Sequence, residues 1–337
     1  MLNFGDLFAG AGLFSCGFMS VGFRPVFAVE LSEDAAASYA RNVSDCIVAS
    51  SVETPPLDVQ KVDVLIAGPP CQGFSTLGRR DPLDVRNDLC LSVLPWIDVA
   101  EPSVVVIENV PPFIRSAHWN RLAEGLRTRG FDIAVWILDA VDFGTAQYRR
   151  RAFTIASKIG PINEPKPLKT RTTIRSVLLE RPVGLSDPMH RWPIPSELAR
   201  QRIEIIPPKG DKRDLMRAAP ELCPPSWREI GCQATDVWGR MDADSPANTL
   251  RCTFQNPSKG RYLHPVEDRV ISLREGARLQ GVPDDWIFVG RPYPVARQIG
   301  NGVPVPLARA VASSILEAFE RTQTCAASKR QLEKTAA

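Results

Sequence analysis

The sequence predicts an α/β fold in which a mostly parallel sheet carries helices on both faces, joined to a smaller, loop-rich domain. Three observations predict it. Short apolar runs alternate with amphipathic stretches as far as about residue 157, prolines and basic residues are dense at 158–240, and regular patterning returns from about residue 265. We therefore expect a first domain at 1–157, a second at 158–240, a return to the first at 241–321 and a polar tail at 322–337 that frays.

The elements follow from local patterns. Ser32 and Asn120 fit as helix starts, and Gly130 fits as a stop. The expected strands are 3–7, 25–29, 46–49, 62–67, 104–107, 132–139 and 151–157. The expected helices are 13–21, 33–42, 89–99, 119–129, 272–279 and 304–321.

Composition bounds the class of protein. The 337 residues are 44% hydrophobic and 23% charged, as in an ordinary globular protein, and a net charge of +3 permits a nucleic-acid partner without arguing for one. No apolar run reaches the roughly 18 residues of a membrane span, and no basic segment precedes the first apolar stretch. We expect a cytoplasmic protein. The eight cysteines form no CxxC pair and no zinc spacing, so we expect thiols and no metal site.

A glycine-rich turn follows the first expected strand. The stretch 4–12 reads FGDLFAGAG, and Glu30 ends the next strand 20 residues after Gly10. Such glycines let a ligand approach the backbone, and an acid at that spacing can accept bonds from two ribose hydroxyls. Ser15 stands where a dinucleotide fingerprint has its third glycine, which favours a nucleoside with a smaller or neutral attachment.

Reactive side chains stand at further strand ends. Cys71 lies in GPPCQGFS at 68–75, where prolines stiffen the chain just beyond a strand. Glu108 ends another strand, and lies beside Cys71 if the two strands are neighbours. Arg149 and Arg151 alternate in QYRRR at 147–151, so in an extended segment they share a face. Each group also has a purely structural alternative. Cys71 could be a packed thiol, and Arg149 and Arg151 could form a solvated basic edge.

Together these groups suit one reaction. A thiolate can add to C6 of a pyrimidine whose N3 is protonated by a carboxylic acid, and C5 then becomes nucleophilic towards a sulfonium methyl group. A base in a duplex must be flipped out to expose C6.

The chain resembles the bacterial DNA (cytosine-5) methyltransferases. The resemblance lies in DLFAGAG at 6–12, Glu30, GPPCQGFS at 68–75, ENV at 108–110, QYRRR at 147–151, SPANTL at 245–250, REGARLQGVPDDW at 274–286 and QIGNGV at 298–303. These motifs occur in the family's order and cover about 1–157 and 240–318. The nucleophile motif and the QxGNxV motif are the most specific of them.

The resemblance implies a Rossmann-like, S-adenosylmethionine-dependent methyltransferase fold and transfer of a methyl group to C5 of a flipped cytosine in a specific duplex sequence, with S-adenosylhomocysteine as product. The implied catalytic residues are Cys71, Glu108, Arg149 and Arg151. The implied cofactor-binding residues are Phe8, Ala9, Gly10, Gly12, Leu13, Glu30, Leu31, Ser51, Val52, Pro70, Leu89, Asn301 and Val303.

The resemblance also places target recognition at 158–240 and a loop that closes over double-stranded DNA at 75–87. Candidate DNA contacts are Gln72, Ser75, Arg79, Arg80, Arg86, Arg171, Arg175, Arg240, Lys259 and Arg261. Because each base-flipping event acts on only one strand of the DNA at a time, we expect a monomer. A cognate restriction endonuclease is compatible with the family, as is a solitary or phage-borne role.

One departure concerns the third expected strand. The family usually has an acid near its end, where it holds the adenine amino group, and this chain has Ser51. The Ser51 hydroxyl could accept the same bond more weakly, or Glu53 could substitute. We expect a modestly weakened cofactor affinity, so Ser51→Asp should bind the cofactor more tightly in calorimetry; an unchanged or lower affinity would contradict this.

Three rival functions remain open. A tRNA cytosine-5 methyltransferase shares the fold, although the basic, proline-rich 158–240 segment favours DNA. A non-enzymatic DNA-binding relative would have lost Cys71 or Glu108. An NAD-dependent oxidoreductase would need the third glycine and has no use for Cys71, Glu108 and Arg151.

Overall fold

The computed structural model describes residues 1–70, 85–230 and 236–336, and the chain divides into two compact units. Unit 1 comprises Met1–Asp139, Arg150–Pro167 and Val303–Ala337. Unit 2 comprises Ala140–Arg149 and Leu168–Gly302. The boundaries expected after residues 157 and 240 describe functional segments and stay a prediction.

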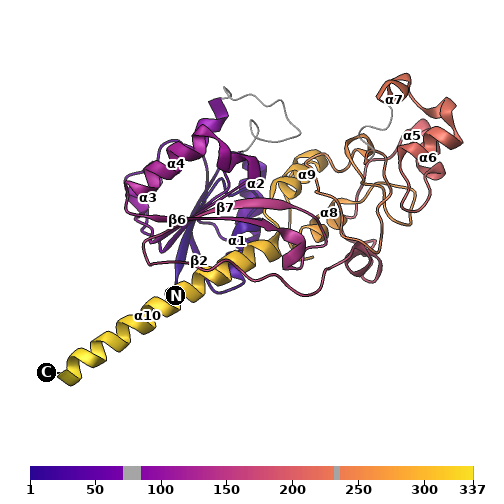
Figure 1. The fold of residues 1–337 in the computed structure, drawn as a ribbon. Coiled ribbons are helices and arrows are strands. Elements are labelled where there is room, and N and C mark those ends of the chain that lie inside the picture. The colour runs from indigo at the N-terminus through magenta and orange to yellow at the C-terminus, as the bar shows by residue number, and fades with distance from the viewer. Residues whose placement is uncertain (71–84, 231–235, 337) are drawn as a thin grey trace. The chain divides into compact units, whose positions relative to one another are not determined.

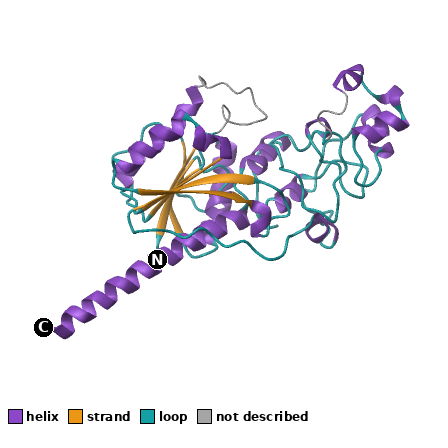
Figure 2. Ribbon diagram, viewed as in Figure 1, coloured by secondary structure: helices purple, strands orange, loops and turns teal. Residues whose placement is uncertain are grey.

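Unit 1 is built on one sheet, whose strands are orange in Figure 2 and three of whose strands, β2, β6 and β7, are labelled in Figure 1. The sheet has seven strands in the order β3-β2-β1-β4-β5-β7-β6. The strands from β3 to β5 are parallel, and β7 runs antiparallel to both β5 and β6. The mostly parallel sheet is confirmed; the reversed strand between β5 and β6 has no counterpart in the local sequence pattern. The strands are β1 (Asn3–Leu7), β2 (Arg24–Glu30), β3 (Ile47–Ala49), β4 (Val64–Ala67), β5 (Val104–Asn109), β6 (Asp132–Asp139) and β7 (Arg150–Ser157).

Helices cover both faces of this sheet because successive strand residues point to opposite sides. On one face, α3 and α4 pack Trp96 and Leu122 against Leu65 and Ile107. On the other face, α1 packs Phe18 against Phe4, with ring centroids 5.6 Å apart. The helices of unit 1 are α1 (Leu13–Met19), α2 (Glu33–Asn42), α3 (Val93–Ala100), α4 (Ala117–Arg127) and α10 (Val305–Ala336), with 3₁₀ turns at Val85–Ser92 (η1) and Pro111–Arg115 (η2).

Two expectations about helices are wrong. Helix α4 begins at Ala117, after Ser116, whose hydroxyl accepts from the Trp119 backbone N–H, so Asn120 lies inside the helix and is not its start. Helix α10 continues to Ala336 through the segment expected to be a fraying tail. That segment contains no glycine or proline, and it has four alanines, two lysines and two glutamines, residues that favour helix.

Unit 2 has no strand among its described residues, only isolated bridges between loops. Its apolar cluster includes Ile203, Leu215, Trp238 and Leu263. The sequence predicted only the first of its two late helices, and none of its three earlier ones. Its helices are α5 (Glu197–Ile205), α6 (Lys212–Ala218), α7 (Pro225–Ile230), α8 (Leu273–Leu279) and α9 (Pro292–Asn301), with short turns at Ala140–Phe143 (η3), Arg175–Leu179 (η4), Pro220–Leu222 (η5) and Pro257–Lys259 (η6).

Candidate active site

Most of the predicted site residues in unit 1 lie at the C-terminal ends of the parallel strands, on one side of the sheet. The glycine turn follows β1, Glu30 ends β2, Ser51 follows β3, Pro70 follows β4 and Glu108 lies at the end of β5. Neighbouring strands therefore bring these residues to one side although they are distant in sequence.

The glycine turn is shaped to admit a ligand. Gly10 and Gly12 have φ of 55° and 85°, and a Cβ at Gly10 would meet no atom within 4 Å. Phe8 has φ of 58°, a conformation that costs a non-glycine residue on the order of 1–3 kcal/mol and is typical of functional sites. The turn thus leaves open space beside its backbone.

The Glu30 carboxylate is held in place by two backbone N–H groups. Its Oε2 accepts from the Gly10 N–H at 2.9 Å and its Oε1 from the Ser32 N–H at 2.8 Å. Each carboxylate oxygen keeps a second lone pair, so the two oxygens can accept one hydroxyl each. The residues present therefore fit a nucleoside. Leu31 beside Glu30 is a largely exposed apolar side chain, whereas Ala9 and Leu13 are buried and contribute packing.

The segment after β3 is fixed by a hydrogen bond from a residue that is distant in the sequence. The Ser51 hydroxyl donates to Glu53 Oε2 at 2.9 Å, so the two residues proposed as alternatives at the missing acid form one hydrogen-bonded pair. Val52 between them is buried, and its carbonyl accepts from the Trp96 indole at 2.7 Å. Trp96 lies 44 residues further along the chain, so no local pattern connects it to this site.

A buried acid lies in β1, before the glycine turn. Asp6 is 1% exposed, and its Oδ2 accepts from the Ser15 hydroxyl at 2.6 Å. The Ser15 hydroxyl in turn lies 3.0 Å from the Tyr39 hydroxyl. Burial raises the pKa of Asp6 to about 8, and the nearby Glu30 adds to the rise, against the Ser15 bond that lowers it. The sequence analysis missed this group, although an acid inside the apolar run FGDLF marks it.

We expect Asp6 to make stability fall as pH rises. Its folded pKa of about 8 lies above the usual value of 3.8, so folded protein keeps a proton that unfolded protein has released between these values. The free energy of unfolding of the wild type should fall relative to Asp6→Asn by up to about 1.4 kcal/mol per pH unit across that window. Urea denaturation from pH 5 to 8 measures this. The exposed Asp45→Asn is the control, and a pH-independent difference for Asp6→Asn would contradict the expectation.

Glu108 and Arg151 form an ion pair across two strands. In the β5–β7 ladder Glu108 faces Phe153, so Arg151, two residues away, lies on the same face as a diagonal neighbour. Arg151 Nε lies 2.7 Å from Glu108 Oε1, and both side chains are largely buried. The other carboxylate oxygen, Oε2, is directed to Gly68, lying 3.9 Å from the position of a Cβ there.

The C-terminal end of β4 lies beside the carboxyl group of Glu108. β4 and β5 are paired neighbours, with Ala67 opposite Ile107, as the sequence analysis required for Cys71 to approach Glu108. The Asn109 amide donates to the Pro69 carbonyl at 3.4 Å. Five predicted site residues lie outside the described residues, namely Cys71, Gln72, Ser75, Arg79 and Arg80. Leu89 lies in η1, as does Arg86, of whose side chain nothing is described.

Arg149 lies directly before the strand that carries Arg151, and the expectation that the two side chains point together stays a prediction. β7 begins at Arg150, and Arg149 belongs to unit 2. Arg149 is 2% exposed and donates to the Leu250 carbonyl at 2.9 Å and the Gly300 carbonyl at 2.7 Å. Asn301, the last residue of α9, also lies in unit 2, and Val303 in unit 1.

The predicted DNA contacts in unit 2 separate into two groups. Arg240 is 3% exposed and donates to four backbone carbonyls and to Asp268, and Arg261 donates to three carbonyls and to Asp211. These two side chains hold unit 2 together, and we leave them out of the contacts proposed below. Arg171 and Arg175 reach the surface beside Asp142 and Asp244, and Lys259 is exposed.

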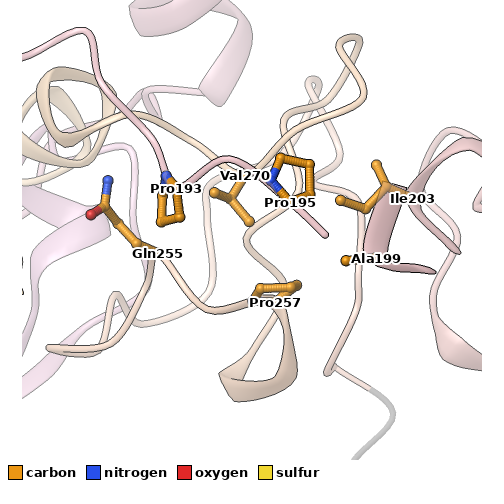
Figure 3. Close-up of a pocket in the computed structure, with 7 residues that line it drawn as sticks. All are labelled: Pro193, Pro195, Ala199, Ile203, Gln255, Pro257 and Val270. Atoms are coloured by element: carbon orange, nitrogen blue, oxygen red, sulfur yellow. The ribbon is translucent and has the colours of Figure 1, made fainter. Parts of the chain in front are cut away.

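Unit 2 also has a small apolar pocket of about 70 Å³ (Figure 3). Gln255 is its one polar lining side chain, and its amide donates to the Arg191 carbonyl. The pocket therefore has no convergent polar groups for catalysis. It is lined by Pro193, Pro195, Ala199, Ile203, Gln255, Pro257 and Val270.

The described part of the chain shows neither a cluster of metal ligands nor a membrane-spanning helix. No group of three or more His, Cys, Asp or Glu side chains there could hold a metal ion. None of the helices there is long and apolar enough to cross a membrane.

Comparison with known proteins agrees with this geometry. Type II methyltransferase M1.BsuMI of Bacillus subtilis (strain 168) is 32% identical and aligns over 91% of this chain and 78% of its own length. Type II methyltransferase M1.HphI of Haemophilus parahaemolyticus is 30% identical over 94% of this chain and 87% of its own.

Solved structures show the same fold. The Entamoeba histolytica methyltransferase EhMeth superposes with a TM-score of 0.66 at 16% identity, covering 95% of this chain and 99% of that one. The S. pombe Dnmt2 methyltransferase gives 0.61 at 17%, covering 95% and 100%. The seven-stranded sheet of unit 1 is thus the Rossmann-like methyltransferase sheet. The model of the family described as C-5 cytosine-specific DNA methylase matches residues 2–317, and the chain belongs to this family of methyltransferases.

Proposed function

We propose that the chain methylates C5 of a flipped-out cytosine in a specific sequence of double-stranded DNA, with S-adenosylmethionine as methyl donor and Cys71 as covalent nucleophile. The observation that carries the proposal is the β4–β5 pairing, which directs Glu108 Oε2 to the exit of β4, three residues before Cys71. Family membership supports the reaction class.

The cofactor is proposed to bind at the strand ends of unit 1. Glu30 would accept the ribose hydroxyls, since its oxygens are already oriented by Gly10 and Ser32. Leu31 offers an exposed apolar surface for the base, and the Ser51–Glu53 pair offers oxygen acceptors. S-adenosylmethionine would supply a methyl group on a sulfonium sulfur, which leaves as S-adenosylhomocysteine once the methyl has passed to C5.

The chain's own residues would carry the remaining steps. The Cys71 thiolate forms a bond to C6 while the Glu108 carboxyl group gives a proton to N3, so the ring can accept the electron pair. Arg151 holds Glu108 Oε1 and thereby orients Oε2. After C5 has gained the methyl group, the C5 proton passes to water, the electron pair of that C–H bond forms the C5–C6 double bond, and the C6–sulfur bond breaks to return Cys71 as a thiolate. N3 then gives its proton back to Glu108.

The proposed DNA surface has two parts. The 75–87 loop would close over the duplex with Ser75, Arg79, Arg80 and Arg86, and Gln72 would contact the DNA from just before this loop. In unit 2 the exposed Arg171, Arg175 and Lys259 would contact phosphates or bases. We propose a monomer. The proposal is compatible with a cognate restriction endonuclease and equally with a solitary or phage-borne enzyme.

Labelled methyl transfer tests the proposal. Wild type and Cys71→Ser would be incubated with labelled S-adenosylmethionine and unmethylated duplex DNA, or with tRNA transcripts, and the DNA sequenced after bisulfite treatment. We expect methylated cytosines in one recurring DNA context, absent with Cys71→Ser. Transfer to tRNA alone would establish the tRNA alternative, and no transfer by folded, cofactor-binding protein would overturn the proposed activity.

A further inference from the structure

Three buried polar side chains form a hydrogen-bonded network next to the glycine turn of unit 1. The Ser15 hydroxyl donates to Asp6 Oδ2 at 2.6 Å and lies 3.0 Å from the Tyr39 hydroxyl. All three residues are at most 1% exposed. They belong to β1, α1 and α2, so the network joins the strand before the turn to the helix after it and to the helix that follows Glu30.

The turn depends on its surroundings for its shape. Phe8 has φ of 58°, and a non-glycine residue keeps such a backbone conformation only where neighbouring structure holds it. The end of β2 supplies part of this support. The Ala9 N–H donates to the Val29 carbonyl at 3.0 Å, and the Gly10 N–H donates to Glu30 Oε2 at 2.9 Å. These two bonds tie the turn to the acid that is proposed to accept the ribose hydroxyls.

The Asp6–Ser15–Tyr39 network supports the same turn from the interior. Tyr39 packs with Ala9 of the turn and Ala28 of β2 in one buried apolar cluster. Asp6 and Ser15 are nine residues apart, and their bond closes the loop that the turn makes between β1 and α1. Without the Ser15 hydroxyl, Asp6 and Tyr39 would each lose this partner in a place where water cannot replace it. The turn would then be held by β2 alone.

Asp6 keeps its proton at neutral pH. Burial raises the pKa of Asp6 to about 8 against the Ser15 bond that lowers it, and the charge of Glu30 adds to the rise. Tyr39 and Cys46 also act on this site, and burial, with Asp6 adding to it, raises the pKa of both. Among the described residues, the titratable groups that act on Asp6 are therefore all acids. A negative charge on Asp6 would be repelled by Glu30 and stabilised by no cation.

This repulsion would couple the proton on Asp6 to cofactor binding. A nucleoside on Glu30 displaces water from the carboxylate, so the repulsion between Glu30 and an ionised Asp6 is screened less. Protein with bound cofactor should therefore keep the Asp6 proton to a higher pH than free protein does. By linkage, the affinity is constant below a pH of about 8 and falls as the pH rises above it.

We propose that Asp6 is a positioning residue for cofactor binding, and that it acts in its neutral form through Ser15 and Tyr39. The network holds the glycine turn against the end of β2 and so keeps Glu30 in the geometry that accepts a nucleoside. Ser15 stands where a dinucleotide fingerprint has a glycine, and a glycine would have no hydroxyl to join Asp6 to Tyr39. The inference rests on the proposed function, in which the cofactor binds at this turn.

Calorimetric affinity for S-adenosylhomocysteine, measured without DNA, tests the network. At pH 7 we expect Ser15→Ala to raise Kd on the order of tenfold, because the turn loses its support from the interior. Ser38→Ala is the matched control. Ser38 is equally buried, but its hydroxyl donates to the Asp34 carbonyl within α2, so its loss should leave Kd within about twofold of the wild type.

A pH profile adds a result that a purely structural role would not produce. Between about pH 7 and pH 9.5, the Kd of the wild type should rise on the order of tenfold relative to the Kd of Asp6→Asn. Asparagine keeps a neutral hydrogen-bonding group and cannot ionise, so at pH 7 the two proteins should bind within about threefold of each other. Titration of the ligand's own amino group affects both proteins equally and cancels in the ratio. Circular dichroism at each pH shows that the protein is folded.

Three outcomes separate the alternatives. A wild-type Kd in folded Ser15→Ala, or a constant ratio between wild type and Asp6→Asn over this pH range, would overturn the proposal and leave the proposed function standing. If Ser15→Ala fails to fold, Tyr39→Phe replaces it, since this variant removes the hydroxyl at the other end of the network; an unchanged Kd there would also overturn the proposal. Folded wild type that binds no S-adenosylhomocysteine at any of these pH values would refute the proposed function itself.

Discussion

The Glu108→Gln variant is expected to lower kcat for methyl transfer by about 10²- to 10⁴-fold, the usual contribution of a general acid. The amide keeps the shape of the side chain, and its oxygen can still accept from Arg151 Nε, which lies 2.7 Å from Glu108 Oε1 in the wild type. An amide cannot, however, give N3 a proton. The loss should therefore fall on the chemical step, which single-turnover methyl transfer at saturating cofactor and DNA measures.

Binding separates this effect from a loss of structure. Glu108→Gln should bind S-adenosylhomocysteine as the wild type does, because Glu30, Leu31 and Ser51 lie on other strand ends. Glu124→Gln, an exposed substitution on α4, is the matched control and should retain full activity. If Glu108→Gln transferred methyl groups within tenfold of the wild-type rate, Glu108 would not be the proton donor.

The Arg240→Met variant is expected to destabilise unit 2 by about 3–5 kcal/mol, the cost typical of removing one partner from a buried ionic network. Methionine fills much of the same volume, but the carbonyls lose their donors in a place that water does not reach. The guanidinium of Arg240 donates to the carbonyls of Ile203, Ile206, His264 and Glu267 and to Asp268 Oδ1, at 2.6–3.0 Å.

Urea denaturation followed by tryptophan fluorescence measures this loss, since Trp227 and Trp238 lie in the apolar cluster of unit 2. Arg200→Met in α5 is the control. Arg200 is half exposed and pairs with Glu197 and Glu204 on the surface of the same helix, where water screens the charges, so its loss should destabilise the unit far less than the loss of Arg240. Equal effects of the two substitutions would show that Arg240 is no structural centre of this unit.

Much of unit 1 was accessible from the sequence because its signals are local. Strand β1 matches its expected bounds, as does helix α2, since apolar alternation and a residue such as Ser32 act within one element. Glu30 and Glu108 stand out for the same reason, as acids at the ends of apolar runs. The order of the strands, by contrast, depends on pairing between distant segments, so the insertion of β7 between β5 and β6 left no local trace.

Unit 2 resisted prediction because its stability is not carried by periodic apolar faces. Helices α5 and α6 are short, and buried charges such as Arg240 and Asp211 hold loops through their backbone carbonyls and N–H groups. A basic residue in a proline-rich stretch has the same composition whether it faces DNA or the interior. Composition therefore suggested DNA contacts for Arg240 and Arg261. Arg240 is buried inside the unit, and the partly exposed Arg261 donates to three backbone carbonyls and to Asp211.

The sequence by itself determined the α/β class, the family and the residue types at each strand end, because motifs such as GPPCQGFS and QIGNGV are contiguous. Only the tertiary structure decided which of those side chains meet. It paired Glu108 with Arg151 and gave Arg149 to the carbonyls of Leu250 and Gly300. The physical reason is that a side chain's role depends on the partners that satisfy its hydrogen bonds, and those partners lie up to 151 residues away.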